Sequence, residues 1–273
     1  MSSRNRMSRA YRTARRIKFN DDSKFIVFSD CHRGDNSFAD DFANNRNIYF
    51  HALQNYYKQG FTYCEVGDGD ELWENLFFKD IFEAHQNVYE LMKLFYAENR
   101  LYRVVGNHDM VYMNQKFVEK TLYTYFDKIT GKDAPLFPGI KFTEGLILEH
   151  EKTGQEIFMM HGHQADWMNY VGWRFNRFML IKVERRTKRW IVENKNIFTI
   201  IGHTHRPRFP EPGDIALFND GSCVHPRSIT GLEIENGEIS LVKWQISTTE
   251  DGTLKVQHVL LEGPQKLIDY KTE

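Results

Sequence analysis

Five short segments of the sequence combine carboxylates, imidazoles and one amide, side chains that bind metal ions or transfer protons. They are Asp30-Cys31-His32, Gly67-Asp68-Gly69-Asp70-Glu71, Gly106-Asn107-His108-Asp109, His161-Gly162-His163 and Gly202-His203-Thr204-His205. A mixed set of oxygen and nitrogen donors suits Mn, Fe or Zn better than Ca or Mg, which prefer oxygen ligands alone. Burying so many ionisable groups without a metal is costly, so the segments together predict a metal centre.

Each of these segments directly follows a short apolar run of strand length. The runs are rich in β-branched and aromatic residues and cover residues 24–29, 61–66, 101–105, 156–160 and 197–201. Their near-continuous apolar character predicts strands that are covered on both faces. Because functional groups collect at the carboxyl ends of strands in α/β sheets, we expect the five segments to converge on one crevice.

Helical patterns lie between and after these strands, and their alternation with the early strands predicts βαβ units. They cover residues 41–59, 76–98, 115–128 and 169–194. The last is basic and rich in aromatic residues, which fits a packed amphipathic helix, a cover over a small phosphodiester, or a contact with a membrane surface. Residues 228–247 predict a hairpin turning at Asn236-Gly237, and residues 256–261 predict a further strand.

The composition describes a globular protein: 273 residues, of which 41% are apolar and 27% charged, with a net charge of −1. It excludes collagen-like, low-complexity and wholly disordered classes. Residues 1–20 carry seven basic side chains and no acidic one, a charge of +7 that leaves −8 for the remainder. We expect residues 1–20 to form a basic arm, either a frayed terminus or a contact with an anionic surface or partner. Residues 21–273 are expected to form a single domain with a helical insertion at about 165–195.

The spacing of the cysteines and the lengths of the apolar runs indicate the cellular compartment. Cys31, Cys64 and Cys223 form no Cys-x-x-Cys pair, which argues against a disulfide framework and a thiolate zinc site. No apolar run approaches the ~20 residues needed to span a bilayer, and the N-terminus lacks the apolar core of a secretory signal. The expected location is therefore cytoplasmic, with a peripheral membrane position through the basic arm as an option.

Taken in order, the five segments resemble the calcineurin-like metallophosphoesterase superfamily. Its motifs are Asp-x-His, Gly-Asp-x-x-Asp/Glu, Gly-Asn-His-Asp/Glu, a lone His and Gly-His-x-His, and they match this chain across residues 24–230. The resemblance implies a four-layer α-β-β-α sandwich of two mixed sheets, with the metals at one edge. The stretch 219–222 is similar to a family Asn-Pro-Gly-Ser segment, with Asp220 in place of the proline.

The resemblance also implies a role for each motif residue and two divalent metal ions, with Mn preferred and Fe or Zn as alternatives. The first ion is expected on Asp30, His32, Asp68 and His205. The second is expected on Asp68, Asn107, His161 and His203, so that Asp68 bridges the two ions. His108 would contact the substrate phosphate beside Asn107 and protonate the leaving oxygen, with its ring oriented by Asp109.

Three assignments next to the motifs have two interpretations each. Asp68 directly follows its strand, so we assign it as the ligand and expect Asp70 to support a ligand or to face solvent. His163 is either an ordinary polar residue or one that supports a ligand or contacts substrate. Arg33 either binds a phosphate oxygen bidentately or forms a structural ion pair.

The function that the resemblance implies is a two-metal phosphoester hydrolase, in which a metal-bound hydroxide attacks phosphorus and His108 assists the leaving group. The substrate would be a phosphorylated small molecule, a nucleotide or a phosphoprotein. Residues 71–73 and 202–207 resemble the UDP-2,3-diacylglucosamine pyrophosphatase branch, which makes a pyrophosphatase acting on a UDP-sugar lipid or a related nucleotide diphosphate an alternative. That branch usually has Arg where this chain has His108. A second alternative is a non-catalytic, anion-binding scaffold of the same fold, which would have no need of His108.

Overall fold

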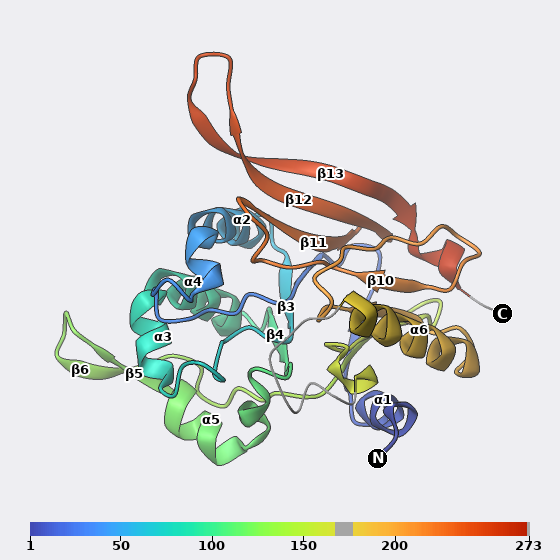
Figure 1. Cartoon of the computed structure of the whole chain (residues 1–273), viewed down its shortest axis with the longest axis horizontal. Coiled ribbons are helices and arrows are strands. Elements are labelled where there is room, and N and C mark those ends of the chain that lie inside the picture. Colours follow the sequence, from blue (N-terminus) through green and yellow to red (C-terminus); the bar gives the residue numbers. More distant parts are fainter. Residues whose placement is uncertain (167–176, 272–273) are drawn as a thin grey trace.

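The computed structural model describes residues 1–166 and 177–271. Within these residues the strands form two mixed sheets, which we call sheets A and B, and a separate two-stranded hairpin (Figure 1). In spatial order, sheet A consists of β1 (Arg15–Phe19), β7 (Leu146–His150), β8 (Glu156–Met159), β9 (Phe198–Ile201) and β10 (Leu217–Asn219). Sheet B consists of β13 (Leu254–Lys266), β12 (Glu238–Thr248), β11 (Ser228–Glu235), β2 (Phe25–Phe28), β3 (Thr62–Val66) and β4 (Leu101–Val104).

Three apolar clusters show how the sheets and helices are layered. One cluster fills the space between the sheets, where Val27 and Cys64 of sheet B meet Ile157 and Ile200 of sheet A. The other face of sheet B is covered by α2 (Arg46–Lys58), α3 (Phe78–Ala84), α4 (Gln86–Ala97) and α5 (Gln115–Leu122). The other face of sheet A is covered by α1 (Ser3–Arg12) and α6 (Arg177–Glu193). The predicted four-layer α-β-β-α sandwich is therefore confirmed.

The five strands predicted to carry the motifs are all present. The parallel pairs β2–β3, β3–β4 and β8–β9 place the carboxyl ends of neighbouring strands together. The side chains of β2 and β9 are buried on both faces, as their apolar runs predict. No helix within the described part of the chain is long and apolar enough to cross a bilayer.

Three predicted helices are interrupted. In the helix expected over residues 41–59, the short helix η1 (Asp41–Asn44) precedes α2. The helix expected over residues 76–98 breaks at His85, a buried residue whose Nε2 lies 2.7 Å from Asp40 Oδ2. The helix expected over residues 115–128 ends at Leu122, because β5 (Thr124–Asp127) pairs with β6 (Lys132–Pro135). Thr, Tyr and Phe in β5 favour a strand once a partner is available. Residues 169–176 of the predicted basic helix lie outside the described residues, and residues 177–193 form α6.

The N-terminal segment is ordered, which excludes the frayed terminus, one of the two interpretations of residues 1–20. Residues 3–12 form α1, and β1 pairs in parallel with β7 from Arg15↔Leu146 to Phe19↔His150. Met7 and Ala10 are buried against sheet A. The interpretation of residues 1–20 as a frayed arm is therefore wrong. Four of its basic side chains, Arg4, Arg9, Arg16 and Lys18, pair with acidic residues of the domain, as in the ion pair between Arg9 and Glu144 at 2.5 Å.

Candidate metal centre

The predicted ligands converge at the carboxyl ends of strands from both sheets. Donor atoms of the first group lie within 4.8 Å of one another, and so do those of the second. The first group is Asp30, His32 and His205, and the second is Asp68, His161 and His203. Asn107 follows β4, and its buried Oδ1 has no hydrogen-bond partner among the described residues.

Asp30 and Asp68 each have one oxygen fixed by the backbone and one directed at imidazoles. Asp30 Oδ2 accepts from the backbone N–H of His203 at 2.8 Å, and its Oδ1 lies 3.0 Å from His205 Nε2. Asp68 Oδ1 accepts from the N–H of His108 at 2.8 Å. Its Oδ2 lies 3.0 Å from His161 Nε2 and 3.8 Å from His32 Nε2. Asp68 therefore lies between the two groups, the position that a bridging carboxylate requires.

The tautomers of two of these histidines test whether the residues fit a metal. The Nδ1 of His161 donates to the carbonyl of Val66 at 2.9 Å, and the Nδ1 of His32 donates to Glu71 at 2.9 Å. A neutral imidazole with a proton on Nδ1 has its lone pair on Nε2. The lone pairs of both rings then face the Oδ2 of Asp68, an arrangement that repels unless a cation lies between them. The residues present fit a divalent metal ion.

The electrostatics of the centre agree with this fit. Burial acts to lower the pKa of His161, but the charge of Asp68 raises it to about 10. Burial likewise lowers the pKa of His32, but the hydrogen bond to Glu71 and the charge of Asp68 raise it to about 9. The site thus has enough negative charge to hold cations, either protons or metal ions.

The backbone of the centre adopts an unusual conformation. Five proposed ligands have left-handed φ values: Asp30 (51°), His32 (49°), Asp68 (51°), His203 (63°) and His205 (52°). Left-handed backbone costs about 1–2 kcal/mol per L-residue, and such strain concentrates at functional sites. The motif glycines allow close approach, because a Cβ at Gly106 would lie 2.0 Å from Asp68 Oδ1.

His108 lies beside the centre and is oriented by Glu71. Its Nδ1 is 2.8 Å from Glu71 Oε1, and its Nε2 is 4.0 Å from Asp68 Oδ2. Because Glu71 also accepts from His32, one carboxylate orients both imidazoles. Trp73 stacks on the His108 ring at a centroid distance of 4.0 Å and remains 47% exposed.

The expectation that Asp109 orients the His108 ring is wrong. The carboxylate of Asp109 instead accepts from the backbone N–H of Gly106 at 2.6 Å and of Gly69 at 2.9 Å. Asp109 therefore links two of the motif loops to each other. Burial and the nearby charge of Asp68 raise its pKa to about 7.

Three further residues around the centre, Arg33, Asp70 and His163, are all buried. Arg33 is 0% exposed and paired with Glu65 and Asp70, so its interpretation as a substrate contact is wrong and the structural ion pair is correct. Asp70 is buried in the same network and does not face solvent. His163 is 7% exposed, with its ring centroid 5.6 Å from that of His161, which favours a supporting role over contact with substrate.

Two carboxyl groups near the centre were not predicted from the sequence. Asp166 follows the short helix η3 (His163–Ala165), and its Oδ2 lies 3.9 Å from His203 Nε2. The feature of the sequence that could have identified Asp166 is its position five residues after His161. Asp220 is buried and accepts from Ser29 Oγ at 2.7 Å, and burial together with the charge of Asp30 raises its pKa well above the ordinary value.

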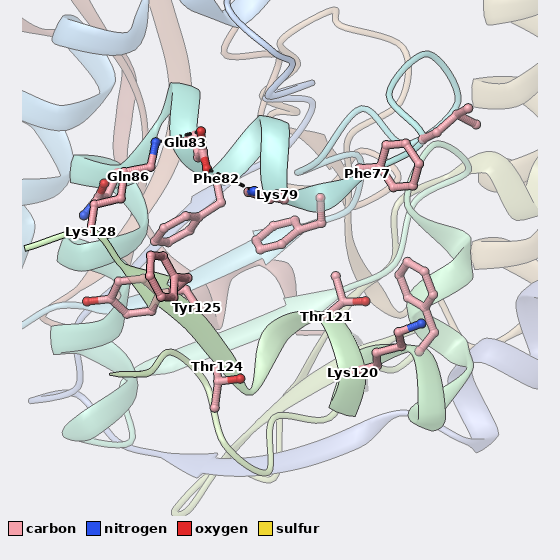
Figure 2. Close-up of a pocket in the computed structure, with 14 residues that line it drawn as sticks. Phe77, Lys79, Phe82, Glu83, Gln86, Lys120, Thr121, Thr124, Tyr125 and Lys128 are labelled. Carbon is pink, nitrogen blue, oxygen red and sulfur yellow. Dashed lines mark hydrogen bonds and ion pairs between the residues drawn. The ribbon is translucent and has the colours of Figure 1, made fainter. Parts of the chain in front are cut away.

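A groove separate from the metal centre lies between α3, α5 and β5 (Figure 2). It has a volume of about 460 Å³ and an aromatic lining in which the rings of Phe82 and Tyr125 lie 4.7 Å apart. Lys79 and Lys128 at its rim both contact Glu83. None of the proposed metal ligands lines this groove.

The two-sheet fold and the cluster of carboxylates and imidazoles at its edge agree with the calcineurin-like phosphoesterase motifs of the sequence. The family model of the calcineurin-like phosphoesterases matches residues 23–230, so the chain belongs to this family. A search of curated proteins gives no match.

Among solved structures, the chain is similar to Vps29 from Chaetomium thermophilum (TM-score 0.41, 11% identity, 87% of this chain and 96% of that one). It is also similar to Vacuolar Protein Sorting 29 from Cryptosporidium parvum (TM-score 0.39, 13% identity, 88% and 98%). A third similar structure is the sulfate thiohydrolase SoxB from Thermus thermophilus (TM-score 0.31, 11% identity, 89% and 57%).

Proposed function

We propose that the protein is a two-metal phosphoester hydrolase. The observation that carries this proposal is Asp68, whose Oδ2 faces both His161 and His32 and so lies between two groups of ligands. One ion would be held by Asp30, His32, Asp68 and His205, and the other by Asp68, Asn107, His161 and His203. Bound there, the ions would supply positive charge to a phosphoryl group and lower the pKa of water.

The protein's own contribution to the reaction would come from His108 and Glu71. Burial acts to raise the pKa of Glu71, but hydrogen bonds from His108 and His32 lower it to about 2, so the carboxylate is ionised at neutral pH. An ionised Glu71 stabilises a proton on Nδ1 of His108 and directs Nε2 toward the centre. His108 would then donate a proton from Nε2 to the leaving oxygen.

The test is hydrolysis of chromogenic phosphate monoesters and diesters by protein reconstituted with Mn²⁺, Fe²⁺ or Zn²⁺. His108→Ala should lower kcat by roughly 10²–10⁴-fold, the contribution typical of a positioned proton donor. Its metal content should not change, and His51→Ala, an exposed histidine outside the centre, should behave as wild type. Loss of metal from His108→Ala would make His108 a ligand. No turnover with any of these metals and substrates would reject a hydrolase of simple monoesters and diesters and leave the pyrophosphatase and the anion-binding scaffold.

A second candidate function is favoured by Trp73. Its exposed ring covers His108, so an aromatic surface adjoins the position of the leaving group. A nucleotide diphosphate has a base that stacks on such a ring, which fits the pyrophosphatase alternative and the branch that shares the Trp73 motif. A panel of nucleoside diphosphate sugars, monoesters and diesters would distinguish the two. Trp73→Ala should raise KM for nucleotide substrates and leave KM for small monoesters unchanged.

A further inference from the structure

Four buried charged residues form a closed network directly beneath the metal-binding loops. Arg33 donates Nη1 and Nη2 to the carboxylate of Glu65 at 2.7 and 2.9 Å and Nε to Asp70 Oδ1 at 2.8 Å. Arg103 donates Nε to Glu65 Oε1 at 2.5 Å and Nη2 to Asp70 Oδ2 at 3.0 Å. All four side chains are at most 3% exposed. We call Glu65, Arg33, Asp70 and Arg103 the quartet.

The carboxylates of the quartet are fully satisfied by further donors. Tyr89 and Tyr112 donate their hydroxyl groups to the two oxygens of Asp70 at 2.6 and 2.7 Å. Tyr63 donates to Glu65 Oε2 at 2.8 Å. Two arginines and two carboxylates give the quartet no net charge. Replacement of a buried ionic network by well-packed apolar residues is often neutral or even stabilising in proteins, so stability alone does not account for the quartet. The geometry that the network specifies is the other contribution that such a network can make.

The quartet is joined through the backbone to the residues that act at the centre. Arg33 follows His32 in the chain, and Asp70 precedes Glu71. The N–H of Arg33 donates to the carbonyl of Gly69 at 3.0 Å, and the N–H of Glu71 donates to the carbonyl of Arg33 at 3.0 Å. The two loops are therefore held side by side by their backbones and by the ion pair of Arg33 with Asp70.

We propose that the quartet is a positioning device, which sets the distance between Glu71 and the imidazoles of His32 and His108. This inference rests on the proposed function, because it assigns the quartet to the same metal centre. Arg103 and Glu65 lie in β4 and β3, and they anchor the device to the core of sheet B. Arg33 and Asp70 lie in the loops that contain His32 and Glu71. Their ion pairs with Glu65 and Arg103 hold these loops in place relative to sheet B. None of the four residues is a proposed metal ligand, and all four are buried.

The first experiment replaces Arg33 by Lys, which keeps the charge but loses the planar fork that binds two carboxylates. All variants are measured as full-length protein, well below their unfolding midpoints. In Arg33→Lys we expect kcat to fall about 10–100-fold with KM within about twofold, as for other residues that orient metal ligands. The affinity for Co²⁺ should fall by a similar factor and its visible absorption spectrum should change, because His32 is displaced. If Arg33 contributed only to the stability of the fold, the absorption spectrum of bound Co²⁺ would stay the same in this variant.

A milder variant and a matched control keep the test decisive. Tyr112→Phe removes one hydrogen bond to Asp70, and it should weaken Co²⁺ affinity and kcat in the same direction even if Arg33→Lys does not fold. Arg100→Lys removes a similar fork, between Arg100 and Glu98 outside the quartet, and should change neither measurement.

The proposal is wrong if Tyr112→Phe, and Arg33→Lys where it folds, keep the wild-type spectrum, Co²⁺ affinity and kcat. If the wild type binds Co²⁺ but turns over no substrate, the proposed hydrolase fails on its own. The Co²⁺ spectrum and affinity of the variants then still decide whether the quartet positions the ligands.

Discussion

At the scale of single residues, the centre depends on a carboxylate that binds no metal in the proposed assignment. Glu71 accepts from the Nδ1 atoms of both His32 and His108, at 2.9 and 2.8 Å. One residue therefore fixes the tautomer of a proposed ligand and of the proposed proton donor at the same time. A change at Glu71 should affect metal binding and turnover together, whereas a change at His108 should affect turnover alone.

Glu71→Gln tests this coupling. The amide keeps the size of the side chain but loses the negative charge that holds a proton on both Nδ1 atoms. We expect kcat to fall about 10–100-fold and metal affinity to fall with it, measured by steady-state kinetics and by titration calorimetry. The exposed neighbour Glu74→Gln is the matched control and should behave as wild type. Unchanged metal affinity in Glu71→Gln would show that His32 does not depend on Glu71.

The raised pKa values of His32 and His161 predict how metal binding depends on pH. Both folded-state values, about 9 and about 10, lie above the ordinary 6.5. In the metal-free protein, protonation therefore stabilises the fold fully below pH 6.5, and this stabilisation is lost as pH rises through 9 to 10. A metal ion must displace these protons, so its affinity should rise by roughly tenfold per pH unit for each proton released. Titration calorimetry with Mn²⁺ at pH 6, 7 and 8 in buffers of different ionisation enthalpy measures this, and a pH-independent affinity would contradict it.

The motifs alone predicted the carboxylates and imidazoles that converge at the centre, but not Asp166 and Asp220 beside them. Each ligand follows an apolar strand, and parallel strands bring their carboxyl ends together, so order along the chain translates into proximity. The partner of His108 was missed because adjacency in sequence pointed to Asp109. In the folded loop, free backbone N–H groups of Gly69 and Gly106 take up that carboxylate instead. Which donor satisfies a buried carboxylate depends on loop conformation, and sequence spacing does not encode it.

At the scale of elements, two helices hold the short helix η3, which carries His163 and leads to Asp166. From α1, Arg6 donates to the carbonyls of Gln164 and Asp166 at 3.0 and 2.9 Å. From α6, Arg186 donates to the carbonyl of Ala165 at 3.0 Å. The basic N-terminal segment thus contributes to the surroundings of His203 through η3, which contacts α1 and α6.

Arg6→Ala should therefore destabilise the protein more than loss of an ordinary surface charge. It leaves two carbonyl groups without a charged donor, and hydrogen bonds of this kind contribute about 1.5–3 kcal/mol. We expect the free energy of unfolding, measured by urea denaturation, to fall by that amount. Arg12→Ala, an exposed arginine on the same helix, should change it by less than about 0.5 kcal/mol. Equal effects of the two substitutions would show that Arg6 does not hold η3.

The elements that sequence patterns failed to predict share a physical cause. The break at His85 depends on a hydrogen bond to Asp40, 45 residues away in the chain. The strand β1 depends on β7, and the strand β5 depends on β6. For His85 and β1, a contact with a residue far away in the chain overrides the element that the apolar periodicity predicts. For β5, pairing in a local hairpin does the same. Runs buried on both faces were predicted correctly because they need no such partner to be recognised.

At the scale of the whole molecule, the centre joins the two sheets. Asp30, Asp68 and Asn107 follow strands of sheet B, whereas His161 and His203 follow strands of sheet A. A metal ion bound by ligands from both sheets cross-links them across the edge of the sandwich. Binding should stabilise the two sheets together and not one of them alone.

Addition of Mn²⁺ at a hundred times its Kd should raise the free energy of unfolding by about 2.7 kcal/mol for one site. Hydrogen–deuterium exchange should slow in β3 and β4 of sheet B and also in β8 and β9 of sheet A. An Asp68→Asn variant should lose most of this protection in both sheets, because Asp68 faces both ligand groups. Protection confined to one sheet would contradict ligation across the sandwich.

The pairing of β1 with β7 also bears on the order of events during synthesis. Arg15 is opposite Leu146, which leaves the ribosome 131 residues later (146 − 15). At about 5–20 residues per second, β1 waits roughly 7–26 s for its partner. Until then residues 15–19 have no partner strand, and residues 1–20 carry a charge of +7. Repulsion between such charges discourages association of this segment with the same segment of other nascent chains. The basic residues would thus protect the segment before β7 is synthesised, in addition to forming ion pairs in the folded protein.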